Sequence, residues 1–192
     1  MNGGWPATIE VIVAFRAELE DFGAFYARTY PGAYRTALAI VRDPGLAADV
    51  TQDAYVSAYR DRGRFRGDAP SAAWFHRILV NAALAGLRRR SSRPREIAVD
   101  DLPGRSPRDV ASSASDRLSV LAALEQLDPR ARAAVVLRYY HDHDYATIAR
   151  ILETSPGNVG VILTRALDRL RAELEPTDRT SLDDPEPTGA DR

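Results

Sequence analysis

The sequence contains no cysteine and no lysine, and only three histidines and two tryptophans occur among its 192 residues. Without cysteine the chain can form no disulfide, and every zinc site that depends on thiolate ligands is excluded. No apolar run approaches the roughly 18–20 residues of a membrane-spanning helix, and the first residues lack the basic start and cleavage site of a secretory signal. We therefore expect a cytoplasmic protein with no cofactor and no membrane insertion.

The charge of the chain is nearly neutral in total but uneven along its length. The formal net charge is −1, and all 26 basic residues are arginines. Residues 87–95, LRRRSSRPR, contain five arginines and no acid, whereas the segment from residue 177 onward is mainly acidic. A local basic cluster is typical of a surface that meets an anionic partner such as nucleic acid. A solvated helix end is the alternative interpretation of the same run.

Apolar residues recur at helical spacing in two blocks, and no segment alternates as a strand would. Residues 96–115, which lie between the blocks, lack periodicity and are rich in serine and proline, as linkers are. The pattern predicts an all-α protein with two small helical domains joined by a flexible linker, whose relative placement the sequence does not fix. The predicted divisions are an N-terminal arm over 1–20, a first domain over 21–95, the linker over 96–115, a second domain over 116–176 and a disordered acidic tail over 177–192.

Particular residues mark where the helices begin and end. In the first block we expect one helix over residues 22–41, a second from Leu46 onward after Pro44-Gly45, and a third from Ser71 to near Pro94. In the second block Asp128-Pro129 and Ser155-Pro156 each combine a cap with a proline at the first helical position. The apolar N-terminal arm, with Ile9 and Phe15 among its residues, is predicted to pack on the first domain.

The stretch HDHD, residues 141–144, places two of the three histidines almost side by side. In an extended segment both imidazoles would point the same way and could hold a metal, but the remaining histidine, His76, lies in the other half of the chain. Asp144 directly precedes a short helical pattern and can accept the free N–H groups of its first turn. We therefore interpret HDHD as a polar turn that ends in a helix cap. A metal-dependent hydrolase is disfavoured, since the chain also lacks a nucleophile elbow and a phosphate-binding glycine loop, and we expect no enzyme.

The segment after this turn has the spacing of a helix-turn-helix: a short helix over residues 145–152, a tight break, and a capped second helix. The second helix of such a unit enters the DNA major groove by its N-terminal end. Asparagine can bond adenine there, and arginine can reach guanine or phosphate. A plain helical hairpin is the structural alternative to this interpretation.

Three segments together carry a family resemblance: AADVTQDAYVSAYR (47–60), RFRGDAPSAAWFHRILVNAALAGLRRR (64–90) and ALEQLDPRARAAVVLRYYHDHDYATIARILETSPGNVGVILTRALDRLR (123–171). With these, the chain resembles the extracytoplasmic-function sigma factors, the smallest bacterial transcription initiation factors of the sigma-70 family. The resemblance implies a protein that binds core RNA polymerase, recognises the −35 and −10 promoter elements and promotes DNA melting without hydrolysing a nucleotide. It also allows for an anti-sigma factor as a partner, which no residue pattern identifies. A helix-turn-helix regulator that binds only duplex DNA is the alternative, although it would leave the first domain without a task.

The resemblance assigns roles to residues of each domain. It places core polymerase binding on Asp49, Gln52 and Asp53. It places contacts to the −10 element on Arg62, Arg64, Phe65, Arg66, Arg77, Asn81, Arg88, Arg89 and Arg90. It places contacts to the −35 element on Ser155, Asn158, Thr164, Arg165 and Arg169. Trp74 is interpreted as a core residue rather than a base-stacking one, because Ile78 and Ala82 share its face.

The chain departs from the family pattern at three positions. Gly160 and Ile162 stand where relatives commonly carry lysine and arginine, and Ala85 replaces the usual acid before the arginine cluster. Fewer cations in the last helix predict weaker nonspecific attraction to DNA and a shallower salt dependence. A glycine inside a helix also costs about 1 kcal/mol relative to alanine.

Overall fold

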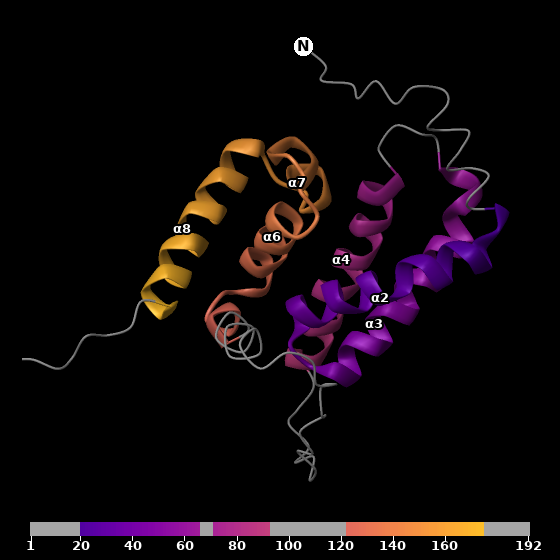
Figure 1. The fold of residues 1–192 in the computed structure, drawn as a ribbon, viewed down its shortest axis with the longest axis horizontal. Helices are drawn as coiled ribbons and strands as arrows, with labels where there is room; N and C mark the ends of the chain where they lie inside the picture. Colours follow the sequence, from indigo (N-terminus) through magenta and orange to yellow (C-terminus); the bar gives the residue numbers. More distant parts are fainter. Residues whose placement is uncertain (1–19, 66–70, 93–121, 175–192) are drawn as a thin grey trace, which may run out of the picture.

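The computed structural model describes residues 20–65, 71–92 and 122–174, and all regular structure within these ranges is helical (Figure 1). The elements are α2 (Phe22–Val41), α3 (Pro44–Asp61), the 3₁₀ turn Arg62–Arg64, α4 (Ser71–Ser92), α6 (Pro129–Tyr139), α7 (Tyr145–Ile151) and α8 (Pro156–Leu174). The all-helical prediction is confirmed. None of these helices is long and apolar enough to cross a membrane. The predicted arm (except Glu20), the linker, the tail and Arg66 lie outside the described residues.

The helices begin and end close to the predicted breaks, although α3 begins at Pro44 rather than at Leu46. Arg42 ends α2 in the left-handed region with φ 61°, and the Asp43 carboxylate then accepts a hydrogen bond from the Leu46 N–H at 2.7 Å at the start of α3. Asp128 caps α6 by accepting from two backbone N–H groups, each at 3.0 Å. Such caps satisfy N–H groups that have no partner within the helix. They fix where each helix starts, and therefore which residues share its exposed face.

An aromatic core joins α2, α3 and α4. The rings of Phe25 and Phe75 meet edge to face with centroids 5.4 Å apart, and the Tyr55 ring lies 4.8 Å from that of Phe75. The Tyr55 hydroxyl lies 2.7 Å from the Thr29 hydroxyl, and burial raises the pKa of Tyr55 to about 12. Paired edge-to-face rings stabilise beyond their buried area. This core holds α3 and α4 at a fixed spacing with their polar faces outward.

Two helical glycines have opposite surroundings. A Cβ added at Gly86 in α4 would lie 2.8 Å from Val50 Cγ1 and 3.2 Å from Leu46 Cδ1, so this glycine permits the close approach of α4 to α3. A Cβ added at Gly160 in α8 would meet nothing nearer than Tyr145 Cε2 at 3.5 Å, an ordinary contact distance. Substitution by alanine should therefore change the free energy of unfolding in opposite directions at the two positions.

We expect Gly160→Ala to raise the free energy of unfolding by about 1 kcal/mol, the difference in helix propensity between the two residues. We expect Gly86→Ala to lower it by about 1 kcal/mol, since overpacking costs of about 1–3 kcal/mol exceed the propensity gain. Urea denaturation followed by circular dichroism measures both, and each variant serves as the control for the other. A stabilised Gly86→Ala protein would contradict the close packing of α3 on α4.

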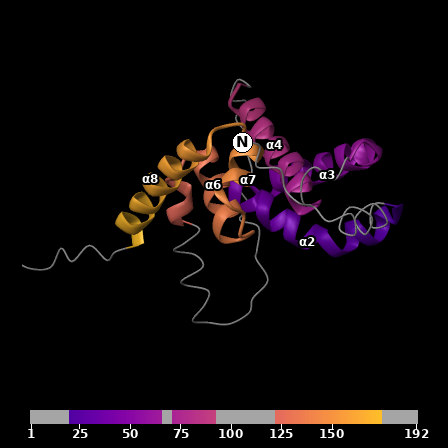
Figure 2. The same cartoon turned by 90° about the horizontal axis from the view of Figure 1, so that it is seen from above.

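The two helix groups pack against each other. α2 contacts α6, and α4 contacts α7. The buried cluster is continuous across this boundary, and it includes Ala33 and Ala37 of α2 together with Ala133 and Ala134 of α6. In two perpendicular views α6 and α7 lie between α8 and the N-terminal helices, which leaves α8 on the outer side (Figures 1 and 2). The sequence left the relative placement open, and the structure places the two groups in one closed body.

Candidate nucleic-acid interface

The three residues assigned to polymerase contact share one side of α3. Asp49, Gln52 and Asp53 are exposed, whereas Val50 and Ala54 on the opposite side are completely buried. Gln52 also lines a groove of about 460 Å³ between α2 and α3. The aromatic residues of that groove are Phe22, Tyr26, Tyr30, Tyr55 and Tyr59. This side of α3 thus combines acid and amide groups with an aromatic groove, a combination that suits a protein partner.

The arginine cluster forms the exposed end of α4. Arg89 Nη2 lies 3.6 Å from Asp53 Oδ2, and Arg90 pairs with Asp43. Hydrogen bonds from the Leu46 backbone and from Arg90 lower the pKa of Asp43. In the described ranges Arg88 forms no ion pair. Two of the three arginines are therefore tied to α3, and Arg88 is the most available for an anion.

The turn before α4 carries two further assigned arginines. The Arg62 guanidinium lies over the Tyr59 ring at 3.7 Å and donates to the Tyr59 carbonyl. Arg64 Nη1 lies 3.2 Å from Asp61 Oδ1, and its side chain is 86% exposed. A cation held over a ring is partly fixed in place. Arg62 is therefore positioned by its neighbours, while Arg64 extends into solvent.

The structure corrects the role given to Phe65. Its side chain is only 3% exposed, and its ring meets that of Trp74 edge to face at 5.5 Å. A buried ring offers no face to a base, so Phe65 instead packs on Trp74 and joins the turn before α4 to that helix. The same contact supports the interpretation of Trp74 as a core residue. On α4 itself, Arg77 and Asn81 are exposed, one turn apart.

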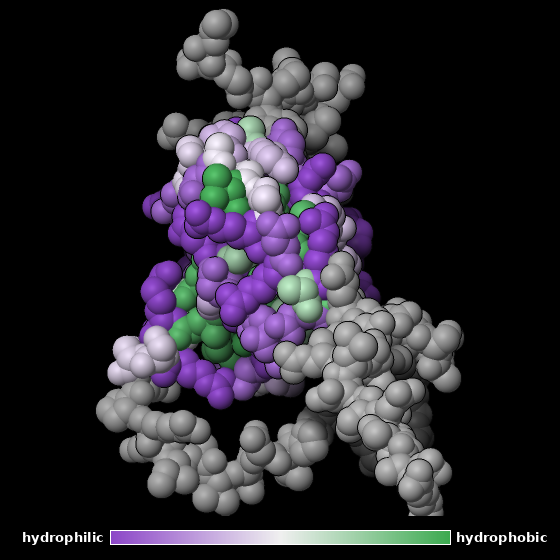
Figure 3. Space-filling view, turned by 90° about the vertical axis from the view of Figure 1, so that its left-hand side faces the viewer, coloured by the Kyte–Doolittle hydropathy of each residue, from purple (hydrophilic) through white to green (hydrophobic). Residues whose placement is uncertain are grey.

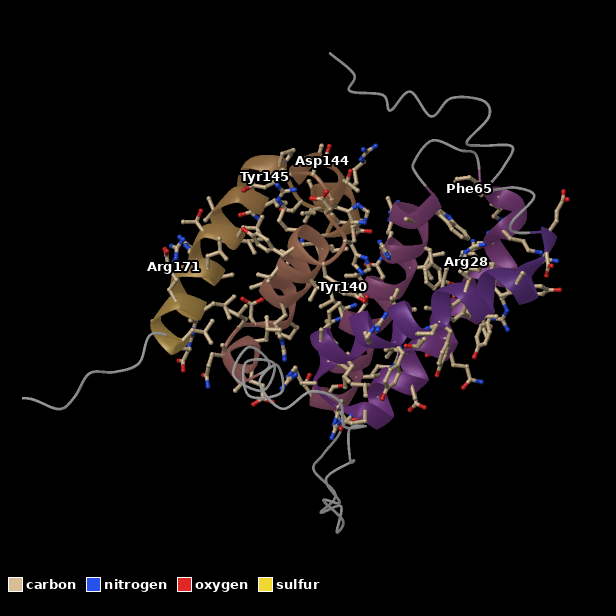
Figure 4. All side chains as sticks on the ribbon, viewed as in Figure 1. Arg28, Phe65, Tyr140, Asp144, Tyr145 and Arg171 are labelled. Atoms are coloured by element: carbon tan, nitrogen blue, oxygen red, sulfur yellow. The ribbon has the colours of Figure 1, made fainter. Side chains whose placement is uncertain are left out.

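The helix-turn-helix is held by local bonds. Asp144 caps α7 by accepting from the Thr147 N–H at 2.7 Å, as predicted, and the side chain of Thr147, followed by this backbone bond, lowers the pKa of Asp144. Arg130 of α6 donates to the carbonyls of Leu152 and Glu153 in the turn before α8. These bonds fix the angle at which α8 leaves α7. Asp144 and Tyr145 mark this end of the unit in Figure 4.

The residues assigned to the −35 element extend from the residue before α8, Ser155, into the fourth turn of the helix. The Ser155 hydroxyl accepts from the Asn158 N–H at 3.2 Å, and Asn158 Nδ2 donates to Thr154 Oγ1 at 2.8 Å. Asn158, Arg165 and Arg169 line a groove of about 260 Å³ between α6 and α8. Thr164 is exposed but does not line this groove. The molecular face on this side is mainly hydrophilic, with smaller hydrophobic patches (Figure 3).

The structure also brings together residues that local sequence patterns kept apart. His76 Nδ1 lies 2.8 Å from His143 Nε2, and His141 Nε2 lies 2.8 Å from the Thr36 hydroxyl. Burial is the main cause that lowers the pKa of His76 to about 2 and that of His141 to about 4. Across residues 20–65, 71–92 and 122–174, no group of three His, Asp or Glu side chains is placed to hold a metal ion. The one sequence feature that could have indicated this cluster is that the chain contains only these three histidines.

Comparison with known proteins accounts for both helix groups. A family model for sigma-70 region 2 matches residues 25–93, and one for sigma-70 region 4 matches residues 117–170. The ECF RNA polymerase sigma factor SigM of Mycobacterium tuberculosis is 35% identical over 149 residues, which are 78% of this chain and 74% of the relative. The chain belongs to the extracytoplasmic-function sigma factors. The RNA polymerase sigma-E factor of Streptomyces avermitilis is also 35% identical, over 80% of this chain and 85% of that relative.

This sigma factor shares its fold with solved structures. The sigma factor RpoE of Bartonella quintana, solved in complex with the anti-sigma factor NepR, aligns with a TM-score of 0.64 at 22% identity. That alignment covers 83% of this chain and 99% of RpoE. CnrH, solved with the cytosolic domain of CnrY, aligns with a TM-score of 0.59 at 23% identity, over 82% of this chain and 92% of CnrH. The match to region 2 decides against a simple helix-turn-helix regulator, since the first helix group is itself a sigma domain. The protein is a transcription initiation factor.

Proposed function

We propose that this sigma factor binds core RNA polymerase through the exposed side of α3, opens the −10 element with α4 and the turn before it, and reads the −35 element with the start of α8. One observation carries the proposal. The assigned polar residues of all three helices lie on exposed faces, while the opposite faces form the buried core. Strand opening needs no reaction at these residues, because the free energy of binding within the polymerase complex drives it.

At the polymerase surface, we assign the first contact to Asp49 and Gln52. Both are exposed on α3, and Gln52 borders the aromatic groove. Asp53 is engaged with Arg89 across the α3–α4 boundary, so it contributes by holding the arginine cluster beside the polymerase surface as well. Polar groups beside an aromatic groove give a partner both orientation and apolar contact.

At the −10 element, we assign phosphate contacts to Arg88 with its neighbours Arg89 and Arg90. Arg62 and Arg64 extend the positive surface along the preceding turn, and Asn81 supplies the exposed amide on α4. Cations along a strand supply most of its affinity, and they make binding sensitive to salt. Phe65 positions this turn rather than touching the bases.

At the −35 element, we assign base contact to Asn158 and Arg165, with Thr164 and Arg169 on the DNA backbone and Ser155 as the cap that orients Asn158. Asparagine reads adenine and arginine reads guanine in the major groove. Because α8 lies on the outer side of the molecule, its exposed face can enter a groove without rearrangement of α6 or α7 (Figure 2).

We further propose that an anti-sigma factor regulates the protein by covering these faces, and that the protein acts in the cytoplasm, where promoter DNA is found. The aromatic groove between α2 and α3 supports the first proposal, because it offers a partner an apolar site next to the polymerase-contacting residues. Covering it would block access of polymerase to Gln52.

The test of the proposed function is run-off transcription by purified bacterial core polymerase on fragmented genomic DNA of the source organism, with and without the protein. Discrete new transcripts are expected only when the protein is present, and alignment of their start sites gives the promoter elements. Asn158→Ala should remove most of them, since a lost bidentate base contact costs about 1–3 kcal/mol. The exposed Glu173→Ala, at the far end of α8, is the matched control. Failure to bind core polymerase at all would reject the assignment.

A further inference from the structure

All three histidines of the chain meet where the two helix groups pack together. The Thr36 hydroxyl donates to the Gly32 carbonyl at 2.9 Å, so at 2.8 Å it accepts from His141 Nε2. His76 Nδ1 and His143 Nε2 lie 2.8 Å apart, and the rings of His76 and His141 are in tilted contact, with centroids 3.8 Å apart. The cluster therefore ties α2 and α4 to the turn between α6 and α7.

The three imidazoles can bind few additional protons while they remain in these contacts. A hydrogen bond between two imidazole nitrogens needs one N–H and one bare nitrogen. When both rings are protonated, His76 Nδ1 and His143 Nε2 each carry a hydrogen, and the 2.8 Å contact becomes repulsive. A charge on His141 would likewise face a charge on His76, because the centroids of the two rings are only 3.8 Å apart. Burial acts in the same direction, and it lowers the pKa of all three imidazoles.

The charged groups around the cluster are largely engaged with one another. Arg138 of α6 donates to the His143 carbonyl at 3.1 Å and lies 3.6 Å from the Asp142 carboxylate. Asp144 caps α7 and faces Arg150 of that helix, and α2 contributes the neutral Thr36. Asp142 and Asp144 oppose the lowering of the His143 pKa, but burial outweighs them. Within the described residues no carboxylate forms an ion pair with an imidazole, so the added charge would have little local compensation.

The closed arrangement occupies part of the surface that we assign to the −10 element. Arg77, next to His76 on α4, has its guanidinium 3.3 Å from the Glu153 carboxylate in the turn between α7 and α8. α7 itself packs on α4. By contrast, α8 points away from the N-terminal helices (Figures 1 and 2). Closure therefore engages Arg77 of the −10 surface and leaves the −35 helix exposed.

We propose that His76, His141 and His143 form an acid-sensitive latch, which holds region 4 against α4 beside Arg77 and opens when the cluster is protonated. Opening frees Arg77 and lets the two regions separate as far as their connection allows. The opening step depends only on the contacts described above, whereas its consequence for promoter binding rests on the proposed function.

The direction of the pH dependence follows from proton uptake. The imidazoles bind fewer protons when the latch is closed than when it is open, where their pKa returns toward about 6.5. Closure is therefore strongest above about pH 7.5 and weakens as the pH falls through about 6.5. At pH 5.5 a histidine whose pKa in the closed form lies well below that pH, as those of His76 and His141 do, shifts the equilibrium toward the open form by about tenfold.

The test measures the distance between the two regions in the full chain. Because the chain has no cysteine, Ser57→Cys on α3 and Glu173→Cys on α8, both at exposed positions, provide unique sites for spin labels. In EDTA-containing buffer we expect one short distance at pH 7.5 and a growing longer population at pH 5.5. Replacing all three histidines with glutamine, which can hydrogen-bond but does not titrate, should keep the short distance at both pH values.

A fixed charge should open the latch without acid. We expect His143→Lys to show the longer distance at pH 7.5, with His143→Gln as its matched neutral control. Circular dichroism confirms that each variant keeps its helices, and Arg77→Ala shows how much of the closure depends on the ion pair instead. An unchanged distance in wild type between pH 7.5 and 5.5, or an equal response of the triple-glutamine variant, would overturn the proposal.

The distance measurement tests the latch, and the transcription assay tests the proposed function, so a negative result in one does not imply a negative result in the other. Transcripts without an acid-dependent change in distance would remove the latch and leave the sigma assignment in place. An acid-dependent change in distance in a protein that yields no transcripts would support the latch and reject the assigned promoter contacts.

Discussion

Replacing Arg88, Arg89 and Arg90 together with alanine is expected to lower promoter-dependent transcription by about 100-fold. Each lost charge-assisted contact to the DNA backbone should cost on the order of 1 kcal/mol or more, and three such losses correspond to about two orders of magnitude in affinity. The slope of log affinity against log salt should also become shallower by about 2–3, since about 0.7–0.9 counterions are released per contact. Titration of holoenzyme onto promoter DNA at several salt concentrations measures both quantities.

Single substitutions of these arginines distinguish a loss of DNA contact from a loss of folding stability. Arg90→Ala also removes the partner of Asp43, which caps α3, although such a partly exposed pair contributes at most about 1 kcal/mol to stability. Arg88→Ala removes no ion pair of the described residues, so its effect should fall on DNA binding alone. Arg171→Ala, which removes a cation from the end of α8, is the matched control. A triple variant with the wild-type salt slope would show that the cluster does not contact phosphates.

Leu137→Ala should destabilise both regions at once. Leu137 of α6 is fully buried in the cluster that runs continuously from α2 to α8, and truncating such a side chain costs about 2–5 kcal/mol. Because the core is shared, we expect one cooperative unfolding transition at pH 7.5, shifted as a whole. Hydrogen exchange followed by mass spectrometry should show faster exchange in α2 and α4 as well as in α6 and α7.

Leu174→Ala provides the comparison, since this leucine of α8 is 45% exposed and its loss should change the free energy of unfolding by less than about 0.5 kcal/mol. If Leu137→Ala accelerated exchange only in α6, α7 and α8, the two regions would be energetically independent despite their contact.

Much of the fold follows from local patterns. The apolar spacing from Phe22 to Val41 predicts α2 with its observed bounds, and Asp128-Pro129 predicts the start of α6. These signals are local because the backbone hydrogen bonds of a helix join residues four apart, and a cap side chain bonds an N–H group only two or three residues further on. The turn at residues 141–144 and the cap at Asp144 follow for the same reason.

The parts that the sequence could not predict depend on contacts between distant residues. His76 and His143 are 67 residues apart, and nothing near either one indicates that α4 would pack on α7. Phe65 stands among arginines and resembles an exposed contact residue, but only its distant packing on Trp74 shows that its ring is buried. The exposure of the site residues on α3 and α8 could be predicted from the sequence, because the helical period determines which residues share the polar face of a helix.

The contact between Phe65 and Trp74 also gives the protein an internal optical reporter. The chain has two tryptophans, and Trp5→Phe would leave the Trp74 indole as the only one. That indole is half-buried beside the turn that precedes α4. Its emission wavelength depends on the polarity around it, so any movement of Phe65 relative to Trp74 in the isolated protein would shift the spectrum. Rearrangement of this turn could thus be followed in real time, with no dye on the protein.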